Sequence, residues 1–217
     1  RAVTVADLGV RTVINCRGTY TIVSGSRLLP QVAEAMVRAS DHYVHMDELM
    51  EQVGQRLAAL TGAEWGYITC GCAAALAQVA TACMAGGDPE KIARLPDTTG
   101  MPNEIIIQRA HRNTYDRALR LAGGVMVEVE TPDELQTAFS ERTALVFING
   151  DTERGDAIPP QEMIVLARAR GIPTLVDAAA QRPDVPNRHL AMGADVVTYS
   201  GGKCLRGPQA SGLALGN

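Results

Sequence analysis

The feature that most constrains the fold of this chain is the alternation of short apolar runs with longer amphipathic stretches. The apolar runs predict buried strands, and the amphipathic stretches predict helices that connect one strand to the next. This order favours an α/β domain with a mostly parallel sheet. We expect strands at residues 65–69, 104–108, 125–129, 144–148, 174–176 and 195–199.

The amphipathic stretches supply the expected helices. Apolar residues recur at helical spacing from residue 30 to residue 60, with a break expected around residues 40–45. Glycine pairs at 86–87 and 123–124 are typical helix ends. Residues 88–101 contain two prolines and are expected to form a polar loop. The remaining helices are expected at residues 73–84, 115–121, 132–139 and 160–170, with a helical turn at 189–192.

Composition narrows the class of protein. The chain has 217 residues, of which 46% are hydrophobic and 20% charged, as in ordinary soluble globular proteins. Its formal net charge of -4 gives no general attraction to nucleic acid, and no apolar stretch is long enough to span a bilayer. No secretory leader is visible, and the odd set of five cysteines indicates reduced thiols in a cytoplasmic protein. Because the chain starts at Arg1, we expect the natural N-terminus to lie upstream.

Two charged side chains follow two of the expected strands. Asp177 ends the apolar run 172–177, and Lys203 lies in a loop of small residues after the strand at 195–199. Ligands of open α/β sheets bind outside the carboxyl ends of the strands, where both residues are expected. This pairing is what pyridoxal phosphate (PLP) chemistry requires: a lysine that forms a Schiff base with the cofactor aldehyde, and a carboxylate that keeps the pyridine nitrogen protonated.

The turn at residues 69–73 is a candidate phosphate site. It joins an expected strand to an expected helix, and its small residues allow the backbone to approach an anion closely. Small residues also occur at such turns for packing alone, and neither a Walker nor a dinucleotide glycine pattern is present. Cys70 and Cys72 resemble a metal or redox pair, but no second cluster completes a ligand set, so no metal site is predicted.

Taken together, these segments resemble the fold-type-I PLP-dependent enzymes of the aspartate aminotransferase superfamily. The closest resemblance is to the branch that contains bacterial selenocysteine synthase and D-glucosaminate-6-phosphate ammonia-lyase. Gly202 precedes the lysine where selenocysteine synthase typically has an acidic residue, which favours the ammonia-lyase side. The segments that carry the resemblance are Ile14-Asn-Cys-Arg-Gly-Thr-Tyr-Thr21, Leu60-Thr-Gly-Ala63, Gln108-Arg-Ala-His-Arg-Asn113, Val176-Asp-Ala-Ala179, Ser200-Gly-Gly-Lys203 and Gly207-Pro-Gln-Ala210.

The resemblance implies a three-layer α/β/α large domain and assigns roles to its site residues. Lys203 would bind the cofactor covalently and act in catalysis, Asp177 would pair with the pyridine nitrogen, and His111 would stack on the ring. Gln181 is a weaker candidate for the phenolic oxygen. Gly71, Cys72 and Ala73 would donate backbone amides to the phosphate, Ser200 would add a hydroxyl, and Ala179 completes the cofactor-binding set.

Each role has a structural alternative. Lys203 can be a surface lysine, Asp177 a turn cap, and His111 a hydrogen-bonded loop residue or a proton carrier. Ser200 can simply satisfy loop amides. Arg17, with Thr19 beside it, is the leading candidate for a substrate carboxylate or phosphate, because a guanidinium binds such groups bidentately. Arg109, Arg112 and Arg206 are weaker candidates that can instead pair with Asp or Glu.

The resemblance favours a PLP-dependent lyase that eliminates ammonia from a hydroxylated amino acid or sugar amino acid. The alternatives are an enzyme like L-seryl-tRNA(Sec) selenium transferase, for which the acidic chain is a poor tRNA partner, and a truncated non-catalytic relative. The expected organisation is an N-terminal segment at residues 1–40 and a PLP-binding large domain at residues 41–217. The C-terminal small domain of the family is expected to be absent from this chain. Fold-type-I enzymes are at least dimeric, which implies a homo-oligomer.

Overall fold

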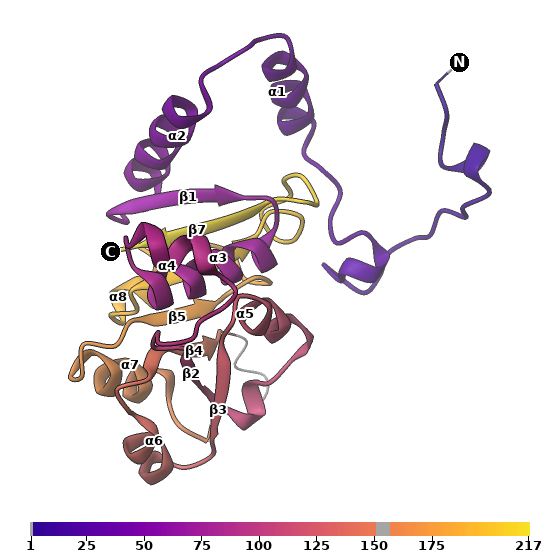
Figure 1. Ribbon diagram of the computed structural model, residues 1–217. Coiled ribbons are helices and arrows are strands. Elements are labelled where there is room, and N and C mark those ends of the chain that lie inside the picture. Colours follow the sequence, from indigo (N-terminus) through magenta and orange to yellow (C-terminus); the bar gives the residue numbers. More distant parts are fainter. Residues whose placement is uncertain (1, 151–156) are drawn as a thin grey trace.

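A seven-stranded sheet forms the centre of the protein in a computed structural model that describes residues 2–150 and 157–217 (Figure 1). The strand order is β1-β7-β6-β5-β4-β2-β3. Strands β2 to β6 pair with their neighbours in parallel, whereas β7 runs antiparallel to both β1 and β6. The strands are β1 Trp65–Thr69, β2 Glu104–Gln108, β3 Val125–Val129, β4 Thr143–Asn149, β5 Thr174–Asp177, β6 Val196–Ser200 and β7 Gly212–Gly216.

Helices cover both faces of the sheet, which confirms the predicted three-layer α/β/α architecture. Alternate residues of β2 point to opposite faces: Ile105 and Ile107 pack with α3 and α5, and Ile106 packs with α6, α7 and α8. All three isoleucines are fully buried. The helices are α1 Pro30–Ser40, α2 Met46–Thr61, α3 Cys72–Ala85, α4 Pro89–Arg94, α5 Arg117–Leu121, α6 Pro132–Ala138, α7 Pro160–Arg168 and α8 Arg188–Ala191. None of the helices in the described residues is long and apolar enough to cross a membrane.

The structure corrects the sequence prediction at two elements. Residues 88–101 are not entirely loop, because Asp88 caps the short helix α4 by accepting hydrogen bonds from the amides of Glu90 and Lys91. Pro89 occupies the first turn, where its missing N–H costs nothing. The sequence analysis also missed β7. That strand begins and ends with glycine, a residue of low strand propensity, so its composition does not mark a strand.

The loops after β1, β4, β5 and β6 all leave the sheet at one edge, because those strands run in the same direction. The antiparallel strand β7 begins at this same edge, where Gly212 pairs with Thr69 on one side and Ser200 on the other. Residues far apart in the sequence therefore meet there. This is the edge at which an open α/β sheet binds its ligands.

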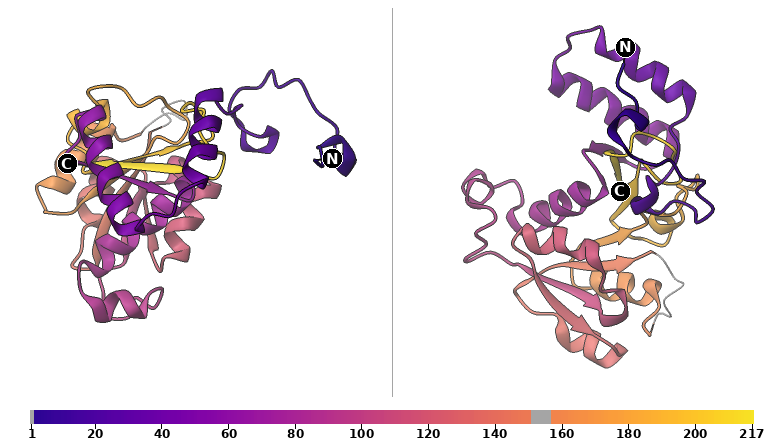
Figure 2. Two further views of the ribbon diagram at one scale, coloured as in Figure 1. Left: turned by 90° about the horizontal axis from the view of Figure 1, so that it is seen from above. Right: turned by 90° about the vertical axis from the view of Figure 1, so that its right-hand side faces the viewer.

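The N-terminal residues 2–29, which we call the arm, extend away from the sheet (Figures 1 and 2). The arm contains two 3-10 turns, Ala6–Leu8 and Thr21–Val23. Most of its large apolar side chains are exposed, including Ile14 at 92% and Ile22 at 90%. After the arm, α1 has no buried residue, whereas α2 packs against the edge strand β1. The arm therefore presents apolar surface that the rest of the described chain does not cover.

The end of the arm is hydrogen-bonded to residues 201–211, which we call the lysine loop. The backbone N–H and the hydroxyl of Ser26 both donate to the carbonyl oxygen of Gly202, at 2.9 and 3.0 Å. The N–H of Leu29 donates to the carbonyl oxygen of Arg206 at 3.1 Å. Gly25 approaches Gly202 so closely that an added Cβ would lie 2.4 Å from its carbonyl oxygen. These contacts fix the lysine loop against the arm.

Gly25→Ala should destabilise the protein more than Gly9→Ala does. Both glycines have positive φ, at 63° and 70°, so each substitution costs about 1 kcal/mol of backbone strain. Only the Cβ at residue 25 also meets the lysine loop, which adds about 1–3 kcal/mol of steric cost, whereas nothing lies within 4 Å of a Cβ at residue 9. Urea unfolding of both variants measures the difference. Equal losses of unfolding free energy would contradict the contact between Gly25 and Gly202.

Candidate active site

Two adjoining cavities open at the carboxyl edge of the sheet. The smaller cavity, of about 210 Å³, has walls formed by the N-terminus of α3, the ends of β5 and β6, the lysine loop, Thr21 and Tyr115. The larger cavity, of about 530 Å³, shares Thr21, Tyr115, Asp177, Ala179 and Lys203 with it. Seven predicted cofactor residues line the smaller cavity: Gly71, Cys72, Ala73, Asp177, Ala179, Ser200 and Lys203.

Asp177 ends β5 and is a buried carboxylate on the wall of both cavities. Its Oδ1 accepts a hydrogen bond from the Ala179 N–H at 3.0 Å and another from the Cys72 thiol at 3.8 Å. Burial raises the pKa of Asp177, although the Ala179 amide and the charge of Lys203 act in the opposite direction. Within the described residues, both of its hydrogen bonds go to Oδ1. Oδ2 therefore remains to accept a proton donor from a ligand.

Lys203 lies in the lysine loop and also lines both cavities. Backbone hydrogen bonds hold it on either side: its N–H donates to the Ser200 carbonyl at 3.3 Å, and its carbonyl accepts from Arg206 N–H at 3.0 Å. Its Nζ lies 5.5 Å from the centre of the Tyr115 ring, within cation–π range. The structure thus brings the predicted lysine and the predicted carboxylate to the same cavity from two neighbouring strands.

The N-terminus of α3 forms the third wall of the smaller cavity. Gly71 precedes the helix with φ of 127°, a conformation that L side chains rarely adopt, and no side chain caps this helix end. The first amides of a helix lack partners within the helix and favour an anion. Gly212 of β7 lies against Gly71, where an added Cβ would be 2.4 Å from the Gly71 carbonyl carbon. Glycine at both positions lets this helix end sit directly beside the sheet.

The donor set of the smaller cavity fits PLP. The cofactor has a phosphate, an aldehyde and a pyridine nitrogen, and the cavity offers an uncapped helix N-terminus, a lysine amine and a buried carboxylate with one oxygen available. Ser200, at the end of β6, adds a hydroxyl to the same wall. These groups come from three separate segments, so their convergence is a property of the fold rather than of one motif.

The larger cavity holds the remaining substrate-side candidates. Thr19 and Gln181 line it, whereas Arg17 is exposed and stacks its guanidinium 4.7 Å from the centre of the Tyr20 ring, itself a wall residue. Gln181 donates through Nε2 to the Gly150 carbonyl, and its Oε1 lies 2.8 Å from His189 Nε2. Burial lowers the pKa of His189 to about 4, with a further contribution from Arg188, so the imidazole beside Gln181 is neutral at physiological pH.

His111 is fully buried and is not among the residues that line either cavity in the described part of the chain. It follows β2, and its Nδ1 accepts a hydrogen bond from the Asn149 N–H at 3.3 Å. Asn149 is a wall residue of the larger cavity and pairs with Asp177 across β4 and β5. His111 therefore lies directly behind the cavity wall, and its role as a stacking residue stays a prediction.

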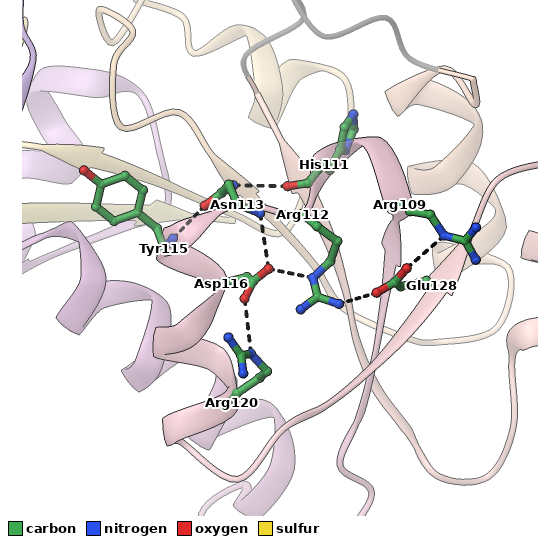
Figure 3. A network of polar contacts seen from close by, with 8 residues as sticks. All are labelled: Arg109, His111, Arg112, Asn113, Tyr115, Asp116, Arg120 and Glu128. Carbon is green, nitrogen blue, oxygen red and sulfur yellow. Dashed lines mark hydrogen bonds and ion pairs between the residues drawn. The ribbon is translucent and has the colours of Figure 1, made fainter.

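A network of ion pairs holds the segment that carries His111 (Figure 3). Asp116 is buried and accepts from Arg112 Nε at 2.6 Å and from Arg120 Nε at 3.2 Å. Arg112 also reaches Glu128 on β3, as does Arg109 at 2.9 Å. These two arginines were candidates for a substrate anion, but the structure pairs both with carboxylates. Their role is to fix the turn after β2 against β3.

Sequence reasoning missed several wall residues. Tyr115 lines both cavities, and Asn113 and Asn149 line the larger one. Asn149 carried a usable signal, because it ends a fully buried strand next to the Asp177 strand. Tyr115 did not, because its position depends on a turn that no periodic pattern marks. Gln209 of the lysine loop also lines the smaller cavity; in the sequence it stood out only as part of the segment Gly207-Pro-Gln-Ala210.

The sequence matches a family model described as Cys/Met metabolism PLP-dependent enzyme over residues 31–213. The chain belongs to this family. PLP is therefore the cofactor of this family, the donor set of the smaller cavity fits it, and the predicted resemblance to PLP-dependent enzymes is confirmed.

Individual relatives narrow the position within the family. The chain is 35% identical to D-glucosaminate-6-phosphate ammonia lyase of Salmonella typhimurium, covering 97% of this chain and 59% of that protein. It is 36% identical to 5'-C-glycyluridine monooxygenase-decarboxylase of a Streptomyces species, covering 96% of this chain and 55% of that protein. A solved structure of D-glucosaminate-6-phosphate ammonia-lyase superposes with a TM-score of 0.91 at 33% identity, covering 98% of this chain and 60% of that chain. The chain thus spans somewhat over half the length of these relatives.

Asp177→Asn should stabilise the cofactor-free protein increasingly as pH rises. A carboxyl whose pKa is raised by folding costs nothing below its ordinary pKa of 3.8; its penalty grows as pH rises from 3.8 to the raised value and is constant above it. The asparagine variant removes this penalty. Thermal unfolding of the PLP-free wild type and variant between pH 4 and pH 8 measures the effect. A difference in Tm that does not change with pH would contradict the buried state of the carboxylate.

Proposed function

We propose that this protein is a PLP-dependent lyase that releases ammonia from a hydroxylated amino acid or sugar amino acid and leaves a 2-keto acid. The observation that carries the proposal is the meeting of Lys203, Asp177 and the N-terminus of α3 at one cavity. The 35% identity to D-glucosaminate-6-phosphate ammonia lyase, whose substrate is a sugar amino acid, supports this reaction over others of the same fold.

Each residue of the site has a separate role in such an elimination. When bound, PLP supplies an electron sink conjugated to the amino nitrogen of the substrate. The Lys203 amine would take the proton from the substrate Cα and deliver a proton when the β-hydroxyl leaves. Asp177 would stabilise the positive charge at the ring nitrogen through Oδ2. The first amides of α3 and the Ser200 hydroxyl would hold the phosphate.

The larger cavity is the proposed substrate site. Its walls carry hydroxyl and amide side chains, which suit a hydroxylated substrate, and it opens beside Lys203. Arg17 lies on the arm, stacked on the wall residue Tyr20, within the segment that would bind the substrate carboxylate. His111 would stack on the cofactor ring. It also accepts a hydrogen bond from the N–H of the wall residue Asn149. Lys203, Asp177 and His111 are the proposed catalytic residues.

Lys203→Ala should abolish turnover and covalent retention of PLP. The chain has only two lysines, Lys91 and Lys203, so borohydride reduction followed by peptide mapping identifies the attached residue without ambiguity. Keto acid and ammonia release is assayed with a panel of hydroxylated D- and L-amino acids and sugar amino acids. We expect both products in equal amounts from at least one sugar amino acid.

The control for this experiment is Lys91→Ala. Lys91 pairs with Asp88 at the exposed start of α4, far from the chemistry, so this variant should retain both activity and covalent PLP. The assignment of Lys203 as the PLP-binding lysine would be wrong if borohydride-reduced PLP were found on Lys91, or if Lys203→Ala still turned over substrate. Release of carbon dioxide in place of ammonia would instead favour the chemistry named for the Streptomyces relative. Selenium transfer to seryl-tRNA is disfavoured by the net charge of -4, because tRNA binding draws on cationic surface.

The same proposal covers the organisation of the chain. Residues 41–217 form the PLP-binding large domain, and residues 1–40 form the segment that leads into it; Arg1 lies outside the described residues. All wall residues of the two cavities except Thr19, Tyr20 and Thr21 come from the large domain. We place the protein in the cytoplasm, because all five of its cysteines are free thiols.

We further propose that the protein is a homodimer or higher homo-oligomer, with the arm in the subunit interface. Contiguous exposed apolar surface marks an interaction site, and Val13, Ile14 and Ile22 are each at least 69% exposed. Replacing Ile14 and Ile22 together by Asp should shift the sedimentation profile toward monomer. Val185→Asp, at a 67% exposed site outside the arm, is the control and should not shift it. An unchanged profile for the arm variant would exclude the arm from the interface.

A further inference from the structure

We propose that Cys72 is a positioning residue for Asp177: its thiol donates to Oδ1 and thereby directs Oδ2 toward the pyridine nitrogen of PLP. The inference rests on the proposed role of Asp177 and holds whichever substrate the enzyme takes. It starts from a contact between residues 105 positions apart in the sequence, with Cys72 Sγ lying 3.8 Å from Asp177 Oδ1.

The backbone around Cys72 places the thiol where it can reach the carboxylate. Cys72 is the first residue of α3, and Gly71 turns the chain into the helix with positive φ. Gly212 admits this helix end to the sheet, because a side chain there would overlap the Gly71 carbonyl group. Asp177 lies next to Thr198 across β5 and β6, and the Thr198 hydroxyl donates to the Val176 carbonyl oxygen at 3.5 Å. Cys72 is thus enclosed between the helix end and two strands.

The protonation state of the sulfur suits a donor. Burial, followed by the negative charge of Asp177, raises the pKa of Cys72 to about 12, although Thr198 and Lys203 act in the opposite direction. The group is therefore a thiol throughout the physiological range, and it can donate to the carboxylate. A hydrogen bond from the thiol lowers the pKa of Asp177, against the effect of burial. The thiol thus helps keep the carboxylate ionised.

The two carboxylate oxygens of Asp177 have different roles: Oδ1 is held by the protein, and Oδ2 is available to a ligand. Oδ1 accepts from both Ala179 N–H and Cys72 Sγ, one from the strand end and one from α3. Two donors from different directions fix the rotation of the carboxylate plane. In the described residues no hydrogen bond to Oδ2 competes with a ligand. Removing the thiol would leave one donor, and the carboxylate could turn away from the ring nitrogen.

The test compares Cys72→Ala with Cys72→Ser in the PLP-loaded protein. Two measurements are made: the Kd of PLP, and the pH dependence of the visible absorption of bound PLP, which reports the charge near the ring. Loss of one hydrogen bond to a charged group should raise the Kd about threefold to tenfold in Cys72→Ala and shift the pH midpoint. Cys72→Ser keeps an O–H donor and should stay within about twofold of the wild-type Kd.

The matched control is Cys83→Ala, which removes a similarly buried thiol with a pKa also raised to about 12, from the same helix. It should change neither measurement. The proposal is overturned if Cys72→Ala behaves like wild type, or if the serine variant is as impaired as the alanine variant. Asp177→Asn separates this failure from failure of the Asp177 role. If the asparagine variant leaves the absorption of bound PLP unchanged, the assumed pairing with the ring nitrogen is itself wrong.

Discussion

A buried carboxylate without a cationic partner in direct contact is the constraint on which this site depends. Asp177 is enclosed at the end of β5, where burial raises its pKa, and an uncompensated charge in such a place is costly. A protein core lowers this cost when a proton or a neighbouring cation neutralises the carboxylate. In the role proposed for Asp177, the protonated ring nitrogen of PLP would be that cation. The ionisation state of Asp177 therefore affects both the free energy of folding and the free energy of cofactor binding.

The sheet topology explains how the partners of Asp177 reach it. Strands β1 to β6 all run in the same direction and end at one edge, and the antiparallel strand β7 lies between β1 and β6 and starts at that edge. This insertion brings the β1–α3 turn and the lysine loop to either side of one strand. Gly212 lacks the side chain that would overlap the Gly71 carbonyl group, and Gly71 turns the chain into α3 with a positive φ that L side chains rarely adopt. Convergence of the site thus depends on backbone approach as much as on the polar residues themselves.

Much of this arrangement could be predicted from local sequence patterns. Strands β1, β2 and β3 were placed at their observed bounds, because continuous apolar runs with clear ends mark buried strands. Lys203 and Asp177 were found because each follows such a run. Strand β7 was missed because a short glycine-flanked segment owes its structure to pairing with β1 and β6 rather than to its own composition. Tyr115 and the Cys72 contact were missed because tertiary packing alone brings them to the site.

The contact between the arm and the lysine loop ties the two ends of this chain into one thermodynamic unit. Ser26 and Leu29 hold the backbone on which Lys203 sits, so ordering one segment lowers the entropy cost of ordering the other. With the cofactor on Lys203 as proposed, linkage is reciprocal: whatever immobilises the arm tightens cofactor retention, and cofactor retention immobilises the arm by the same free energy. In the proposed homo-oligomer, assembly and the binding of vitamin B6 would then be coupled, and a subunit released from its neighbours would lose its coenzyme more readily.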